Sequence, residues 1–154
     1  MILSKKLLRY KNIRHCFLGI EGGKSKGIYK SLNCGIGSSD VIINVKKNLE
    51  IACRKINSSY DNLILLHQIH SNKFFFIKKN FKFNKKKIKA DAIITDQEKL
   101  PIAILTADCV PILLYDGNRK MIAAIHAGWK GAFKEIIQKV ISFMLLKGCK
   151  KKNI

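Results

Sequence analysis

Three side chains in this sequence combine the chemistry needed to hold a catalytic metal ion: His70, Cys109 and His126. Each lies at the end of an apolar run typical of a buried strand, where a scaffold can present a side chain to a cleft. One thiolate and two imidazoles suit Zn²⁺, and three protein ligands leave the fourth tetrahedral position open, as in catalytic sites. Their separations match no short zinc motif, so spacing alone leaves open that the three residues are unrelated.

Another histidine, His67, precedes His70 in the segment "HQIH". In an extended strand the side chains at positions i and i+3 point to opposite faces. His67 and His70 could therefore not reach one ion if this segment is a strand. We expect His67 to be structural or exposed to solvent.

The segment "HAGWKG" at 126–131 places candidate substrate contacts directly after His126. Gly128, Trp129 and Lys130 precede a predicted helix, and the free N–H groups at a helix N-terminus attract anions such as phosphate. Lys130 would add a positive charge there. Trp129 could stack on a base, although packing in the core is the more common fate of a single tryptophan.

Apolar patterning predicts the elements that must position these residues. The predicted strands are "NLILLHQIH", "KFFFIKK", "DAIITD", "LPIAILTA" and "VPILLYD", and the turn signal "DGN" favours a hairpin from 110–115 to 121–126. A helix is expected over 41–56 with Asp40 as its N-cap. Residues 1–20 are expected to be strand-like, 21–40 to form a glycine- and serine-rich loop, and 78–89 to form a basic surface segment.

The helix that follows "AGWKGAF" is expected to run for about 15 residues, with Gly148 as its C-cap. Its predicted apolar face comprises Phe133, Ile136, Ile137, Val140, Ile141 and Met144.

Composition limits the class of protein. A chain of 154 residues with 47% hydrophobic residues can bury a core, and no apolar run reaches the ~18 residues of a membrane helix. We see no secretory signal in the N-terminal residues, so we expect a cytoplasmic protein with no membrane partner. The five cysteines are scattered and form no CxxC pair, which argues against a disulfide framework.

The formal net charge of +20 has two interpretations. A basic surface attracts nucleic acid, but the excess is nearly all lysine, as codon bias in an AT-rich genome would produce. Lysine substitutes poorly for arginine in bidentate contacts to phosphate or guanine. We therefore expect no specific nucleic-acid partner, with non-specific binding at low salt.

Four motifs occur in order along the chain: "QIH" at 68–70, "ADAIIT" at 90–95, "TADCVPILL" at 106–114 and "HAGWKG" at 126–131, preceded by the loop "GGKSKGIYKSLNCG" and the helix segment "VKKN". In this order they resemble the laccase-domain family, whose members are also called multicopper polyphenol oxidoreductases and purine nucleoside phosphorylases. The resemblance implies a single α/β domain over 1–154, with mixed β-sheets covered by helices.

The resemblance also implies an activity: phosphorolysis of adenosine, inosine and methylthioadenosine with phosphate, and hydrolytic deamination of adenosine. It implies a zinc ion held by His70, Cys109 and His126, the same residues that the strand-end argument selects. These three would be the catalytic residues, and Gly128, Trp129 and Lys130 would bind substrate. The oligomeric state is left open.

The sequence departs from the family pattern at positions where arginine is usual. Ile20 precedes the glycine pair, Leu49 follows the helix asparagine, and Lys130 stands in the last motif. If those arginines hold phosphate, two of the phosphate contacts are lost here and the third, from Lys130, is weaker. The sequence also lacks the Gly-Pro-Ile-Gly segment and the C-terminal part expected after the last helix. We therefore expect a shortened chain that keeps its metal ligands but turns over weakly or not at all.

Three rival functions stay open at this point. A copper-dependent polyphenol oxidoreductase would need more ligands than the four histidines supply for a multicopper centre. A cysteine hydrolase would use Cys109 as a thiolate nucleophile paired with a histidine. A basic, non-enzymatic relic would bind polyanions through charge alone.

Overall fold

The computed structural model describes residues 1–78 and 88–154, which form two compact units, Met1–Leu63 and Ile64–Ile154. Most of the predicted basic segment 78–89 lies outside the described residues. The predicted α/β class with mixed β-sheets is confirmed, whereas the expectation of one domain over 1–154 stays a prediction. None of the described helices is long and apolar enough to cross a membrane.

The first unit is built around helix α1 (Ile42–Arg54), which confirms the helix predicted over 41–56. Val45, Leu49 and Cys53 of its apolar face are buried. On the same helix Asn48 is fully buried and its side chain fastens the glycine- and serine-rich loop. Its amide donates to Ser25 Oγ, Ser31 O and Asn33 O, and its oxygen accepts from Lys24 N.

Two predictions for this unit were wrong. Residues 1–20 form no strand: they contain the 3₁₀ helix η1 (Leu7–Arg9) and a single bridge between Ile2 and Phe17. The N-cap of α1 is Val41 rather than Asp40. The Asp40 carboxylate instead accepts hydrogen bonds from Ser25 Oγ and Asn33 Nδ2, so it serves the loop as well as the helix start. Two further 3₁₀ helices complete the unit, η2 (Gly27–Tyr29) and η3 (Tyr60–Asn62).

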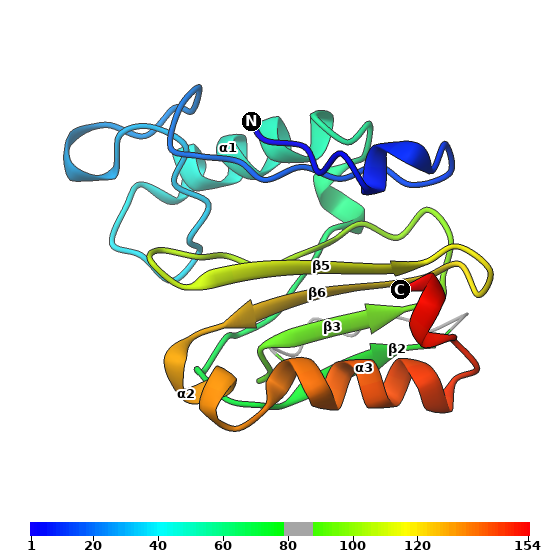
Figure 1. The fold of residues 1–154 in the computed structure, drawn as a ribbon. Helices are drawn as coiled ribbons and strands as arrows, with labels where there is room; N and C mark the ends of the chain where they lie inside the picture. The colour runs from blue at the N-terminus through cyan, green and yellow to red at the C-terminus, as the bar shows by residue number, and fades with distance from the viewer. Residues whose placement is uncertain (79–87) are drawn as a thin grey trace. The chain divides into compact units, whose positions relative to one another are not determined.

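The second unit contains a four-stranded sheet in the order β2-β3-β6-β5 (Figure 1). Its strands are β2 (Phe74–Ile77), β3 (Ala92–Thr95), β5 (Val110–Asp116) and β6 (Met121–Ala127). β2 pairs with β3 in parallel, and β6 is antiparallel to both β3 and β5. The predicted β5–β6 hairpin is confirmed, and the Asp116 carboxylate accepts N–H groups of its turn.

The strands of the second sheet are much shorter than the sequence predicts. This sheet consists of β1 (Ile64–Leu65) paired in parallel with β4 (Ile102–Ala103). The strands predicted over "NLILLHQIH" and "LPIAILTA" therefore stop early. After β1, His67 forms an isolated bridge with Lys89, and the N–H groups of residues 69–71 then bond to a carboxylate rather than to a neighbouring strand.

The predicted long helix is two helices, α2 (Trp129–Phe133) and α3 (Ile136–Leu146). The break falls at Glu135, which has a left-handed backbone with φ 60°. Phe133 was predicted to be in the core but is 84% exposed, because it precedes this break. The C-cap of α3 is Lys147 rather than the predicted Gly148; Gly148 follows it with φ +86°, the left-handed conformation that commonly ends a helix. The 3₁₀ helix η4 (Lys151–Asn153) follows.

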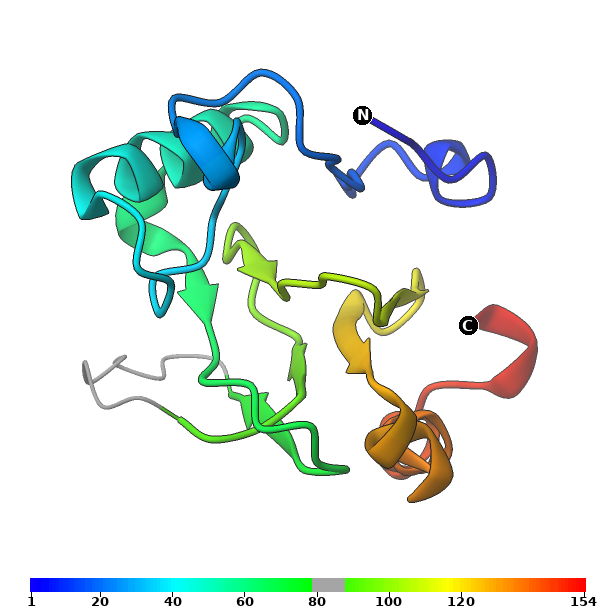
Figure 2. The same cartoon turned by 90° about the vertical axis from the view of Figure 1, so that its left-hand side faces the viewer.

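The core of the second unit lies on both faces of the four-stranded sheet. α3 covers one face with Ile136, Val140 and Met144, all fully buried against residues of β3 and β6. Figure 2 looks nearly along α3 and shows it on one side of the strands. On the other face Ile93 packs with Ile64 and Ile77. Because β3 is buried on both faces, the residues at its ends are held rigidly.

Candidate metal centre

His70, Cys109 and His126 converge in the second unit, as the sequence predicts. One ligand atom from each lies within 4.8 Å of the other two. The Sγ atom of Cys109 is 3.9 Å from Nε2 of His70, and the two imidazole rings meet edge to face with centroids 4.8 Å apart. His126 is buried, Cys109 half-buried and His70 exposed. The group is therefore open to solvent on one side.

The β5–β6 hairpin brings two of the three residues together. Its register pairs Val110 with Ala127 and Pro111 with His126. Cys109, directly before β5, consequently lies beside the end of β6 and Gly128. The strand pairing thus brings Cys109 and His126, which are far apart in the sequence, close together in space.

A buried aspartate, Asp91, orients His126. Its Oδ1 atom lies 2.9 Å from Nδ1 of His126. Burial opposes ionisation of Asp91, but hydrogen bonds led by those from Ser71 more than offset this and hold the pKa of the carboxyl below its ordinary value. An ionised carboxylate only accepts, so the His126 proton belongs on Nδ1 and Nε2 is free to bind a metal.

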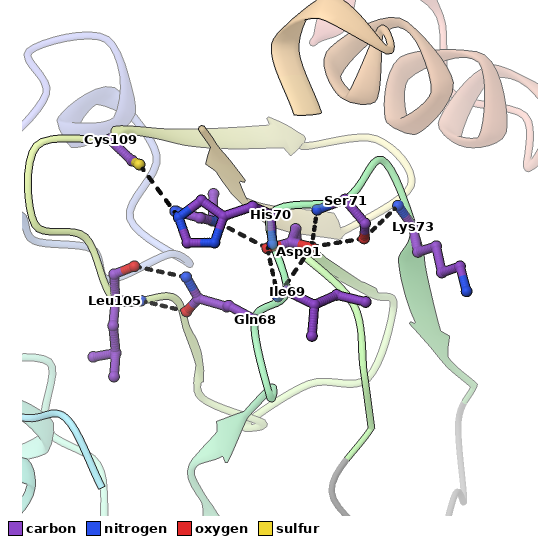
Figure 3. Close-up of polar contacts among 9 residues, drawn as sticks. Gln68, Ile69, His70, Ser71, Lys73, Asp91, Leu105 and Cys109 are labelled. Atoms are coloured by element: carbon purple, nitrogen blue, oxygen red, sulfur yellow. Dashed lines mark hydrogen bonds and ion pairs between the residues drawn. The ribbon is translucent and has the colours of Figure 1, made fainter. Parts of the chain in front are cut away.

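The same carboxylate holds the loop that carries His70 (Figure 3). Its oxygens accept the backbone N–H groups of Ile69, His70 and Ser71 at 3.1, 3.0 and 2.6 Å, and the Ser71 hydroxyl at 2.7 Å. His70 itself has a left-handed backbone with φ 54°, which is uncommon for a residue with a Cβ atom. The carboxylate therefore stabilises a turn that the chain would not adopt by itself.

A second clamp joins the His70 segment to the segment that leads to Cys109 (Figure 3). The Gln68 amide donates to Leu105 O at 2.7 Å and accepts from Leu105 N at 2.8 Å. The side chain thus replaces a strand neighbour for this part of the backbone.

Gly128 lies against all three candidate ligands. A Cβ atom built on it would lie 2.9 Å from Cδ2 of His70, 3.3 Å from Sγ of Cys109 and 3.6 Å from Cε1 of His126. Gly131 is equally confined, because its Cβ would lie 2.7 Å from Ser71 O. The two glycines of "HAGWKG" therefore let α2 pass close to the site.

The other predicted substrate residues lie at the surface beside the group. Trp129 is 74% exposed rather than packed in a core, and Lys130 Nζ lies 5.4 Å from its ring centroid. α2 has only five residues. Of the positions where the family usually has arginine, Ile20 is 68% exposed and Leu49 is buried in the first unit.

The donor set fits a transition metal such as Zn²⁺. Tetrahedral coordination with ordinary Zn–S and Zn–N lengths requires about 3.4–3.6 Å between ligand atoms. The Cys109–His70 distance of 3.9 Å is near this range, and the group as a whole, with ligand atoms up to 4.8 Å apart, would contract when it binds an ion. His126 has the carboxylate partner typical of metal-bound histidines. His67 is exposed and outside the group, as expected.

Sequence reasoning missed Asp91 as a functional residue. The signal was present: a charged residue stands directly before the apolar run "AIIT", whose four residues are all buried. A carboxylate in that position needs several donors to compensate for burial. The donors come from residues about 20 and 35 positions away, so no local pattern could name them.

Comparison with known proteins identifies the family. The family model described as multi-copper polyphenol oxidoreductase laccase matches residues 14–154. The chain belongs to this family. Curated relatives named purine nucleoside phosphorylase include one from Bacteroides thetaiotaomicron, 32% identical over 90% of this chain, and one from Corynebacterium glutamicum, 36% identical over 95%.

Solved structures of family members have the same fold. Bacillus licheniformis hypothetical protein YfiH matches 83% of this chain with a TM-score of 0.76 and 26% identity. Neisseria meningitidis protein NMB0706 matches 80% with a TM-score of 0.69 and 34% identity. The chain spans about half the length of these proteins, and 53% and 59% of the two curated relatives.

Proposed function

We propose that the chain carries a zinc-dependent purine nucleoside phosphorylase site formed by His70, Cys109 and His126. The observation that carries this proposal is the convergence of one thiol and two imidazoles within 4.8 Å. The names of the Bacteroides and Corynebacterium relatives support the activity.

The proposed substrates are adenosine, inosine and methylthioadenosine together with phosphate, and the proposed second activity is deamination of adenosine. Phosphorolysis depends mainly on positioning phosphate near the ribose C1′ atom and on stabilising charge. Lys130, two residues after Gly128, supplies a positive charge 5.4 Å from the Trp129 ring centroid, and the exposed Trp129 ring offers a face on which a purine can stack. Gly128 keeps this approach free of side-chain atoms.

His70, Cys109 and His126 would hold the metal, which when bound supplies Lewis-acid chemistry at neutral pH. The residues around them keep the donors in place. The Asp91 carboxylate, 2.9 Å from Nδ1 of His126, would hold the ring proton there, and Gln68 ties the His70 segment to the Cys109 segment. We place the reaction in the cytoplasm, in keeping with five free thiols, and without a specific nucleic-acid partner.

Elemental analysis of the purified chain tests the metal site. We expect about one zinc per chain, lost in Cys109→Ala and kept in Cys16→Ala, which removes another half-buried thiol. Adenosine and inosine are then incubated with and without phosphate, and release of free base is followed by chromatography. Phosphate-dependent release that Cys109→Ala abolishes supports the proposal; a folded, zinc-free wild type contradicts it.

One rival function has a specific observation in its favour. The contact between Cys109 and His70 at 3.9 Å also suits a thiolate nucleophile with a histidine base. A cysteine hydrolase would be active without metal, and a chelator would not inhibit it. Copper with phenol oxidation in the elemental and activity assays would instead favour the laccase function.

A further inference from the structure

We propose that Asp91 is a positioning residue that sets both histidine ligands at once, selecting the ligating nitrogen of His126 and fixing the backbone turn at His70. This inference rests on the proposed metal site. It assigns to one buried carboxylate the control of ligand geometry, with no direct contact to the ion required.

The inference rests on the groups that each of the two carboxylate oxygens contacts. Oδ1 faces Nδ1 of His126 at 2.9 Å and the backbone N–H of His70 at 3.0 Å. Oδ2 faces the backbone N–H and the hydroxyl of Ser71 at 2.6 and 2.7 Å. The backbone N–H groups of His70 and Ser71 are donors and the Ser71 hydroxyl donates to Oδ2, so both oxygens accept; an accepting Oδ1 then favours a proton on Nδ1 of His126.

The position of Asp91 in the fold makes this arrangement rigid. Asp91 is fully buried and stands directly before β3, the strand that is buried on both faces. Its backbone also takes part, because Asp91 O accepts from His126 N and Asp91 N donates to Lys73 O. The carboxylate therefore cannot move without disturbing the sheet, and it holds the imidazole of His126 and the backbone that carries His70.

Asp91→Asn is the most direct test, because the amide of asparagine replaces one of the two acceptor oxygens with an NH₂ donor. If the NH₂ group faces Ser71, two donors oppose each other across 2.6 Å and the turn at His70 must shift. If it faces His126, Nδ1 must become the acceptor and the proton moves to Nε2, which blocks the ligating nitrogen. Either orientation damages the metal site, and we expect zinc affinity to fall about 10- to 100-fold.

Asp116→Asn is the matched control. Asp116 is also fully buried in the second unit and accepts backbone N–H groups from Asn118, Arg119 and Lys150. None of these three partners belongs to the candidate metal centre. We expect this variant to lose stability but to bind zinc within about threefold of wild type, since its hydrogen bonds do not reach a ligand.

The experiment measures zinc affinity by chelator competition, at a temperature where circular dichroism shows each variant folded. In parallel, long-range ¹H–¹⁵N NMR spectra of the metal-free wild type near pH 8.5 report which nitrogen of His126 carries the proton. We expect the Nδ1–H tautomer in wild type. Co²⁺ substitution adds a spectrum that reports the coordination geometry.

The outcomes separate the inference from the function on which it rests. Weak zinc binding only in Asp91→Asn, with the Nδ1–H tautomer in wild type, supports a positioning role. An Nε2–H tautomer in wild type, or unchanged affinity in folded Asp91→Asn, overturns it even if zinc binds. If Asp91→Asn does not fold, the wild-type tautomer still tests the positioning role: Nδ1–H supports it and Nε2–H overturns it. Absence of zinc binding in wild type defeats the proposed function instead.

Discussion

Gly128→Ala tests whether the candidate metal centre depends on the absence of a single side chain. Gly128 has φ −72° and ψ 161°, a conformation that alanine adopts without strain. The backbone therefore gives no reason for a loss of stability, and restricting the unfolded chain would contribute about 0.4–1 kcal/mol in favour of folding. Any defect must come from contacts of the new methyl group.

The size of that defect follows from the distances. The new Cβ would lie 2.9 Å from Cδ2 of His70 and 3.3 Å from Sγ of Cys109. Carbon atoms pack at about 3.5–4.0 Å, so the His70 ring must move by roughly half an ångström or more. A shift of that size changes the position of one ligand relative to the other two. We therefore expect zinc affinity to fall at least about 10-fold, the scale on which misplaced ligands act.

The assay is zinc affinity by chelator competition, with thermal unfolding of the metal-free protein as the measure of fold. Gly19→Ala is the matched control, because a Cβ there meets nothing within 4 Å. We expect this variant to match wild type in both measurements. Wild-type zinc affinity in Gly128→Ala would refute the steric reasoning, and a collapse of the metal-free fold would show that Gly128 serves the fold rather than the site.

Three further predictions concern stability. Met144→Ala should cost about 2–5 kcal/mol in urea unfolding because Met144 is fully buried, whereas Leu146→Ala on the same helix should cost less than about 0.5 kcal/mol because Leu146 is 85% exposed. Glu135→Gly should raise Tm, since glycine removes roughly 1 kcal/mol of left-handed backbone cost at φ 60°; an unchanged or lower Tm would contradict this. Burial opposes ionisation of Asp116, but its N–H donors prevail and lower its pKa, so its stabilisation is present above about pH 4 and lost as pH falls through the folded-state pKa. Unfolding free energies between pH 7 and 3 should therefore fall less steeply in Asp116→Asn.

The parts of the fold that the sequence predicted are those governed by local patterns. The β5–β6 hairpin follows from two apolar runs around a turn signal, and the apolar spacing of α1 and α3 follows from helical periodicity. The end of α3 was predicted to within one residue from Gly148, because a left-handed glycine depends only on its own backbone preference.

The parts that sequence reasoning missed depend on partners distant in the chain. The turn at His70 is held by the Asp91 carboxylate. After the short strand β1, the Gln68 side chain bonds to the Leu105 backbone in place of a neighbouring strand. At the helix break, Asn72 Nδ2 donates to Lys134 O beside Glu135. In each case a tertiary hydrogen bond overrides the local preference for a strand or helix. The candidate ligands themselves were found because each ends an apolar run.

The antiparallel pairing of β5 with β6 bears on how such a site can be recognised across divergent sequences. Cys109 and His126 lie at one end of the hairpin, whereas the turn between Asp116 and Met121 lies at the other. Insertions or deletions in that turn would alter the number of residues between the two ligands without moving either of them. A search pattern with a fixed number of residues between the two ligands would miss relatives that differ there. The short sequence motifs around each ligand would still find them.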